Sequence, residues 1–113
     1  MLFRSSKFGS LKPFDKRCTI EVTGGLNRPP MERSAGVRGL FRTAKKLAAE
    51  LGLTLEESST GGGSDGNFTA AMGVPTLDGL GAVGEGAHAV NESLLISRIA
   101  DRTALLAKLV AAI

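Results

Sequence analysis

The stretch Ser34–Gly52, SAGVRGLFRTAKKLAAELG, reads as an amphipathic helix. Its apolar residues recur three and four positions apart, which places them on one helical face. These residues are Val37, Leu40, Phe41, Ala44, Leu47, Ala48 and Leu51. Ser34 is a suitable N-terminal cap, and Gly52 is suited to the position just after the last turn. The pattern predicts a helix within residues 31–51.

Three shorter runs around this helix have the alternation or β-branched content of strands, namely residues 18–23, 53–57 and 74–78. A short helix is expected at 68–72. A second long helix is expected at 94–113, with Ile96, Ile99, Thr103, Leu106, Val110 and Ile113 on its buried face. This order of elements indicates an α/β fold. Because such a domain normally has about five strands, we expect apolar surface near Leu77, Leu80 and Val83 to stay exposed.

The composition excludes several classes of protein. The 113 residues suffice for one small domain, and no apolar run approaches the length of a membrane-spanning helix. A single cysteine rules out a disulfide framework, and the lack of Trp and Tyr speaks against a base-stacking nucleic-acid surface. Residues 1–14 lack the apolar segment of a secretory signal, so we expect a cytoplasmic protein. A periplasmic or secreted location would require a signal on a longer precursor.

Charge divides the chain into two halves. Residues 1–50 carry an excess of Lys and Arg, whereas residues 51–113 carry an excess of Asp and Glu. The first half is either a basic arm for anionic partners or an ordinary solvated surface, and the scattered basic residues favour the second interpretation.

The glycine-rich loop TGGGSDGN, residues 60–67, is the first candidate site. Three consecutive glycines before a helix allow an anion to approach backbone N–H groups, and both phosphate and carboxylate fit. The loop lacks the Lys of a P-loop and the third glycine of a dinucleotide fingerprint. The alternative is a plain turn in which Ser64 and Asp65 cap the following helix.

Two further residues attract attention. His88 is the only histidine and lies in a glycine-rich loop, where it is either a ligand or an ordinary surface residue. Alone it does not make a zinc site, which takes three or four protein ligands. Arg28 precedes Pro29 and Pro30, which could fix its guanidinium for carboxylate binding or simply stiffen a linker.

Residues 60–92, with GGGSD, GVPTLDGLG and GAH in this order, resemble the C-terminal part of the co-catalytic zinc amidohydrolases and exopeptidases, peptidase family M20. This family includes glutamate carboxypeptidase, acetylornithine deacetylase and succinyl-diaminopimelate desuccinylase. The upstream stretch TIEVTGGLNRPPME resembles the return from the lid domain of the glutamate carboxypeptidase branch. The resemblance implies that residues 1–30 are a remnant of a lid or dimerisation domain. It implies that residues 31–113 are the C-terminal part of the catalytic domain, with helices packed on a short sheet.

The resemblance also implies roles for individual residues. His88 matches a zinc ligand, and Arg28 matches a lid arginine that binds the substrate carboxylate. The glycine loop matches a substrate-binding loop, through Thr60, Gly61, Gly62, Gly63 and Ser64. Family members use two zinc ions and a Glu general base to hydrolyse an amide or peptide bond next to a free carboxylate. The implied substrate is a small N-acyl amino acid or peptide, and a homodimer is one implied assembly; no nucleic-acid or membrane partner is expected.

The other family motifs, a His-x-Asp, a Glu-Glu pair and a bridging Asp, find no match in this sequence. We therefore expect no catalytic residue on this chain and at most one partial zinc site. The chain is expected to hydrolyse amides only together with the missing N-terminal catalytic part. A non-catalytic carboxylate-binding or protein-interaction module is the alternative, and a small nucleotide-binding protein is a third, less favoured interpretation.

Overall fold

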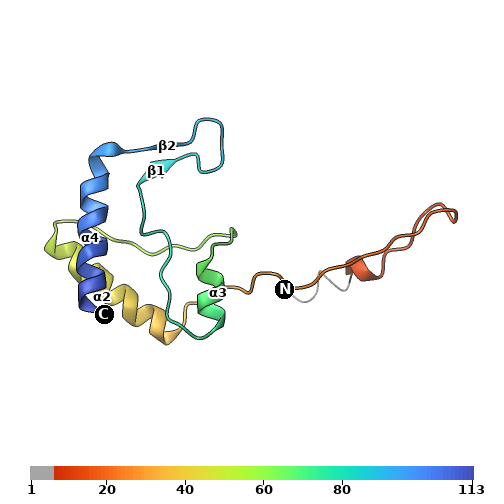
Figure 1. The fold of residues 1–113 in the computed structure, drawn as a ribbon, viewed down its shortest axis with the longest axis horizontal. Helices are drawn as coiled ribbons and strands as arrows, with labels where there is room; N and C mark the ends of the chain where they lie inside the picture. Colours follow the sequence, from red (N-terminus) through yellow and green to blue (C-terminus); the bar gives the residue numbers. More distant parts are fainter. Residues whose placement is uncertain (1–6) are drawn as a thin grey trace.

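The computed structural model describes residues 7–113 (Figure 1). The molecule is elongated, with extents of 65 × 36 × 17 Å and a radius of gyration of 19.8 Å. Two long helices lie at one end, loops and a short helix fill the middle, and residues 7–27, which we call the arm, project to the other end. The predicted lid remnant at 1–30 lies partly outside the described residues, as do the first six residues of the region examined for a signal.

Helix α2, Ala35–Glu50, confirms the predicted amphipathic helix. The Ser34 hydroxyl accepts a hydrogen bond from the Val37 amide at 3.2 Å, and Gly52 takes the left-handed conformation, φ +71°, just after the C-cap. The helix begins later than residue 31 because Ser34 is extended, with φ −68° and ψ 172°. Ala44 and Ala48 are fully buried, so the predicted face is the packed one.

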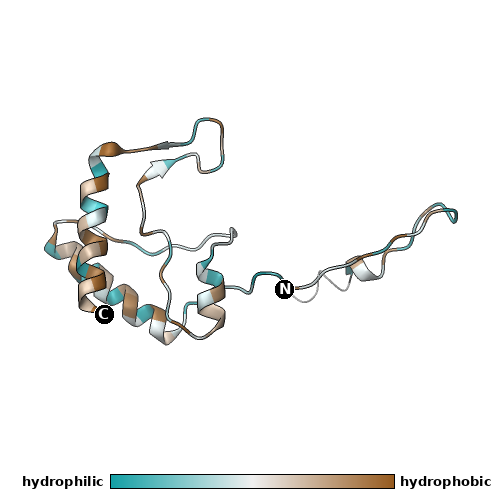
Figure 2. Ribbon diagram, in the orientation of Figure 1, coloured by the Kyte–Doolittle hydropathy of each residue, from teal (hydrophilic) through white to brown (hydrophobic). Residues whose placement is uncertain are grey.

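Helix α4, Ile99–Ala112, follows a 3₁₀ turn, η1, at Ile96–Arg98 and packs on α2. Leu105 and Leu109 are its buried residues, and Lys108 Nζ lies 2.8 Å from Glu50 Oε2 of α2. The predicted buried face is wrong, since Ile96, Val110 and Ile113 are more than two-thirds exposed. Apolar residues recur along most of the length of the helix (Figure 2), so burying Leu105 and Leu109 leaves Ile99, Leu106 and Val110 exposed.

The three predicted strands are wrong as hydrogen-bonded elements. Residues 18–23, 53–57 and 74–78 belong to no helix or strand, because no other segment of residues 7–113 pairs with them. The one sheet formed by residues 7–113 is a short antiparallel hairpin, in which β1, Gly84–Glu85, pairs with β2, Ser93–Leu94. β1 lies in the glycine-rich loop that contains His88, whereas β2 includes Leu94, the predicted first residue of the second long helix, which in fact begins at Ile99. The fold is thus mixed, two packed helices and a small sheet, which is compatible with part of an α/β domain.

Exposed apolar surface is confirmed as a main feature of residues 7–113. The buried residues there are Ala44, Ala48, Leu105 and Leu109. Leu77, Leu80 and Val83, singled out above, are only half-buried. None of the helices described is long and apolar enough to span a bilayer.

Candidate functional site

The glycine loop is closed by side chains at its junction with the short helix α3, Gly66–Ala71. The Ser64 hydroxyl accepts a hydrogen bond from the Gly66 amide at 3.1 Å, and the Asn67 side-chain oxygen accepts one from the Ser64 amide at 2.8 Å. Asp65 occupies the N-cap position but makes no capping bond with its side chain. The expected cap is therefore supplied by Ser64 and not by Asp65. Gly73, at φ +84°, follows the end of this helix, as predicted.

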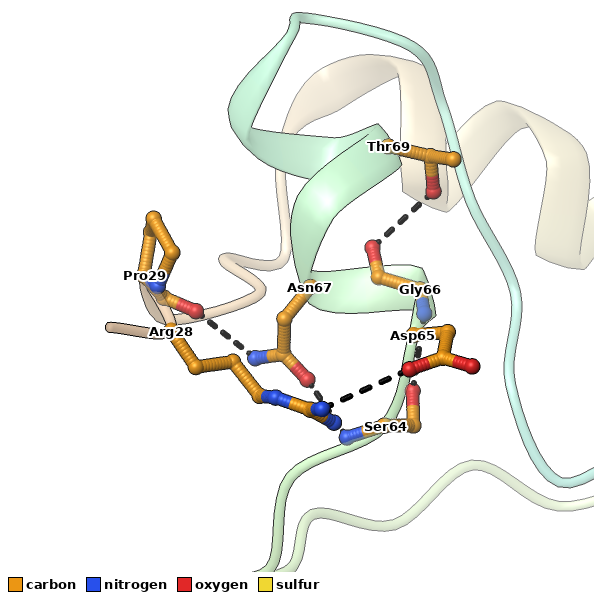
Figure 3. A network of polar contacts seen from close by, with 7 residues as sticks. All are labelled: Arg28, Pro29, Ser64, Asp65, Gly66, Asn67 and Thr69. Carbon is orange, nitrogen blue, oxygen red and sulfur yellow. Dashed lines mark hydrogen bonds and ion pairs between the residues drawn. The ribbon is translucent and has the colours of Figure 1, made fainter.

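Arg28 lies directly against this loop (Figure 3). Its guanidinium carbon is 4.9 Å from the centre of the Phe68 ring, within the range of a cation–π interaction. Its Nη2 atom is 3.4 Å from the Asp65 Oδ1 atom. A Cβ atom at position 63 would lie 2.7 Å from the Arg28 Cδ atom, so the close approach depends on Gly63.

Asn67 links the two segments that carry the candidate residues. Besides its bond to Ser64, it donates a hydrogen bond from Nδ2 to the Pro29 carbonyl oxygen at 2.8 Å (Figure 3). Sequence reasoning treated Asn67 only as the last residue of the loop and Phe68 only as the first of a helix. The sequence offered one signal for the role of Asn67. It is a polar residue that follows a run of glycines and stands at the start of a helix, where such side chains hydrogen-bond to nearby backbone groups.

The remaining loop residues are open to solvent. Thr60 Oγ1 accepts a hydrogen bond from the Gly62 amide at 3.3 Å, and Thr60, Gly61 and Gly62 are all exposed. The Arg28 side chain retains 36% of its exposure, whereas that of Asp65 is 97% exposed. A mostly solvated Asp65 is a weak, screened partner, which leaves the guanidinium able to bind another carboxylate at the loop.

His88 lies in the loop that joins β1 and β2. Its backbone is in the left-handed region, φ +68°, and its amide donates a hydrogen bond to Glu92 Oε2 at 3.3 Å. Its side chain is exposed. Figure 1 shows the hairpin loop apart from the start of α3. An open cavity of about 580 Å³ beside the hairpin is lined by residues 82, 84–87 and 92–94 and by no residue of the glycine loop.

The structure therefore brings Arg28 and the glycine loop together, whereas no hydrogen bond or ion pair among residues 7–113 joins His88 to either. The family resemblance also implies that His88 and the glycine loop line one cleft, and this stays a prediction. The described residues also contain no group of three or more His, Cys, Asp and Glu side chains arranged to hold a metal ion. A two-zinc centre does not fit this set of residues, since each zinc needs three or four ligands.

Comparison with curated proteins yields no match, and neither does comparison with solved structures. The model of the peptidase family M20/M25/M40 matches residues 7–112, almost the whole chain. The matched range includes Arg28, the glycine loop and His88 together with both long helices. On this evidence the chain belongs to the peptidase family M20/M25/M40, a family of hydrolases that are generally metal-dependent.

Proposed function

We propose that this chain forms the carboxylate-binding part of a zinc-dependent carboxypeptidase or amidohydrolase. Arg28 would bind the free carboxylate of a small N-acyl amino acid or peptide, with the backbone N–H groups of the glycine loop beside it. Family membership supports the hydrolase class. The observation that carries the proposal is the placement of the Arg28 side chain against Gly63 and Phe68, beside a loop in which the Gly61 and Gly63 amides donate no hydrogen bond to any described residue.

The physical basis is charge-assisted hydrogen bonding. A guanidinium presents paired N–H donors that match both oxygens of a carboxylate, and such pairs are stronger than neutral hydrogen bonds. The Asn67 bridge holds the carbonyl oxygen of Pro29, the residue after Arg28, so the arginine's backbone has little freedom to swing from the loop. A site whose parts are already in position loses less entropy when its ligand binds.

His88 would contribute one metal ligand in the complete enzyme, and the remaining ligands would come from polypeptide outside residues 7–113. The chain alone would therefore not hydrolyse amides. The alternative is a carboxylate-binding module without catalysis, and the lack of a metal-holding cluster among the described residues favours it for the isolated chain.

The test is a titration of the isotope-labelled chain with N-acetylglycine, followed by amide chemical shifts. We expect the shifts at Gly61, Gly62 and Gly63 to move and saturate, and we expect none with N-acetylglycinamide, which lacks the carboxylate. Arg28→Ala should abolish the response, whereas Arg38→Ala, which removes a guanidinium from α2, should leave it intact. Equal responses to both compounds would refute carboxylate recognition. Hydrolysis of N-acetyl amino acids by the chain with added zinc, lost in His88→Ala, would refute the proposed inactivity.

A further inference from the structure

We propose that Asp65 sets the charge selectivity of the Arg28 site. Among small N-acyl amino acids, the site prefers one with a cationic side chain and disfavours one with a second carboxylate. This inference rests on the proposed binding of a carboxylate by Arg28, and it narrows the class of ligand that the site takes. Family membership alone leaves the side chain of that ligand open.

Asp65 differs from the other polar side chains of the glycine loop in what it contacts. Thr60, Ser64 and Asn67 each accept a hydrogen bond from a nearby backbone amide, and so hold the loop in shape. The Asp65 side chain makes no capping bond to α3 and instead lies 3.4 Å from Arg28 Nη2 (Figure 3). Because this side chain is 97% exposed, its charge can act on any ligand that approaches Arg28.

The charge of the site comes from one cation and one anion. Arg28 and Asp65 are the only charged residues in the two segments that build the site, residues 26–31 and 60–73. A change at Asp65 therefore alters the charge of the site without altering the guanidinium that binds the carboxylate.

The two charges lie close enough for one ligand to interact with both. The Phe68 ring lies over a face of the guanidinium, 4.9 Å from its carbon, and leaves the N–H groups along its edge for a carboxylate. A ligand oxygen bonded to Nη2, at about 2.8 Å, stays within the Debye length of about 8 Å from the Asp65 carboxylate. Asp65 therefore repels a second carboxylate on the ligand and attracts an ammonium group.

Release of Asp65 from Arg28 favours the same ligands. A ligand with one carboxylate replaces the Arg28–Asp65 ion pair by its own and leaves Asp65 without this partner. A ligand that also carries an ammonium group provides a new partner, so that two ion pairs replace one. Because the pair is largely solvated, each contribution is modest. We expect a selectivity of about two- to fivefold for each ligand charge.

The test compares ligands of matched size. Dissociation constants are measured at low salt from the amide chemical shifts of Gly61, Gly62 and Gly63. We expect Nα-acetyllysine to bind about two- to fivefold more tightly than Nα-acetylnorleucine, and Nα-acetylglutamate about two- to fivefold more weakly than Nα-acetylglutamine. Both ratios should fall towards unity as the salt concentration is raised.

Asp65→Asn keeps the shape of the side chain and removes its charge. It should bring both ratios to about one and tighten the binding of the two uncharged side chains, because Arg28 then has no carboxylate to release. Asp101→Asn is the matched control, since Asp101 also pairs with an arginine, Arg98, but on α4. This control should leave both ratios unchanged.

The outcomes separate this inference from the proposed function. If the chain binds none of the four ligands, the proposed function fails and the inference fails with it. If all four bind equally, or if the preferences persist in Asp65→Asn, carboxylate binding by Arg28 stands and selectivity through Asp65 is refuted. Loss of all binding in Asp65→Asn also overturns the inference, because it would show that Asp65 holds the loop.

Discussion

The helix pair α2–α4 and the glycine-rich region between the two helices differ in how far they satisfy their backbone hydrogen bonds and bury their apolar side chains. The helices satisfy their own backbones by local hydrogen bonding and bury Ala44, Ala48, Leu105 and Leu109 against each other. The region between them, residues 53–95, forms one two-residue strand pair and leaves its strand-like segments open. The difference shows that regular structure in this chain forms where hydrogen-bond partners are close in the sequence, because a helix needs no distant partner and a strand does.

The largest effect on stability is expected from a substitution in the core of the helix pair. Leu105 is fully buried, so Leu105→Ala should cost about 2–5 kcal/mol, which is enough to separate the helices. Leu106, its neighbour, is 38% exposed, and Leu106→Ala should have a clearly smaller effect. Urea unfolding followed by far-UV circular dichroism measures both. Equal losses for the two variants would mean that α4 does not pack on α2 through Leu105.

A second comparison sets two glycines of α2 against each other. A Cβ atom at position 36 would lie 2.7 Å from the Pro75 ring, whereas one at position 39 would meet nothing within 4 Å. Gly39→Ala should stabilise the helix by about 0.5–1 kcal/mol. Gly36→Ala gains the same propensity but forces Pro75 away, with a strain of about 1–3 kcal/mol. Thermal unfolding should move in opposite directions, and a stabilised Gly36→Ala would refute the contact with Pro75.

A third prediction concerns the order of the glycine loop. Asn67→Ala removes the hydrogen bonds to the Pro29 carbonyl and the Ser64 amide, each worth about 1 kcal/mol. Amide exchange at Ser64 should accelerate, while exchange within α2 should not change. Thr60→Ala serves as the control, because the one hydrogen bond of its hydroxyl among the described residues is to Gly62 of the same loop. Unchanged exchange at Ser64 would mean that Asn67 does not hold the loop.

The smallest expected effect is a loss of stability in acid. Hydrogen bonding to Lys108 lowers the pKa of Glu50, and hydrogen bonding to Arg33 lowers that of Glu57, from an ordinary value of 4.5. A lowered folded-state pKa contributes stability that is present above pH 4.5 and is lost as the pH falls through the folded value. Both pairs are partly solvated, so the change is modest. Glu50→Gln should flatten the dependence of unfolding on pH below 4.5, and an unaltered slope would show that this pair contributes nothing.

The sequence predicted those elements whose stability is local. The apolar spacing, Ser34 and Gly52 defined α2 to within a few residues, and Gly73 marked the end of α3. The strands predicted at 18–23, 53–57 and 74–78 did not form. Alternating apolar and polar residues show that a segment suits a strand, but they do not show that a neighbouring strand is present to pair with it. For α4, several apolar faces compete, and spacing alone could not say which one meets α2.

In the candidate site, too, some features could be predicted from the sequence and others could not. The family resemblance gave Arg28 and the glycine loop substrate-binding roles without stating that they touch, and the structure places the two side by side. The Asn67 bridge and the Phe68 ring under Arg28 were missed, since both depend on how distant segments meet. The cleft that the resemblance implies for His88 and the loop stays a prediction, because it depends on a sheet that residues 7–113 do not complete.

The backbone of His88 has one more consequence, for how binding and folding can be separated. A left-handed φ of +68° costs a side-chain-bearing residue about 1–2 kcal/mol that glycine does not incur. His88→Gly would therefore relieve the turn while deleting the imidazole. At most positions, a substitution that removes a metal ligand also destabilises the fold, and one measurement cannot separate the two effects. For His88→Gly we expect stability to rise while metal binding falls. If the variant is more stable but does not support metal binding in a completed enzyme, the loss is due to the imidazole alone.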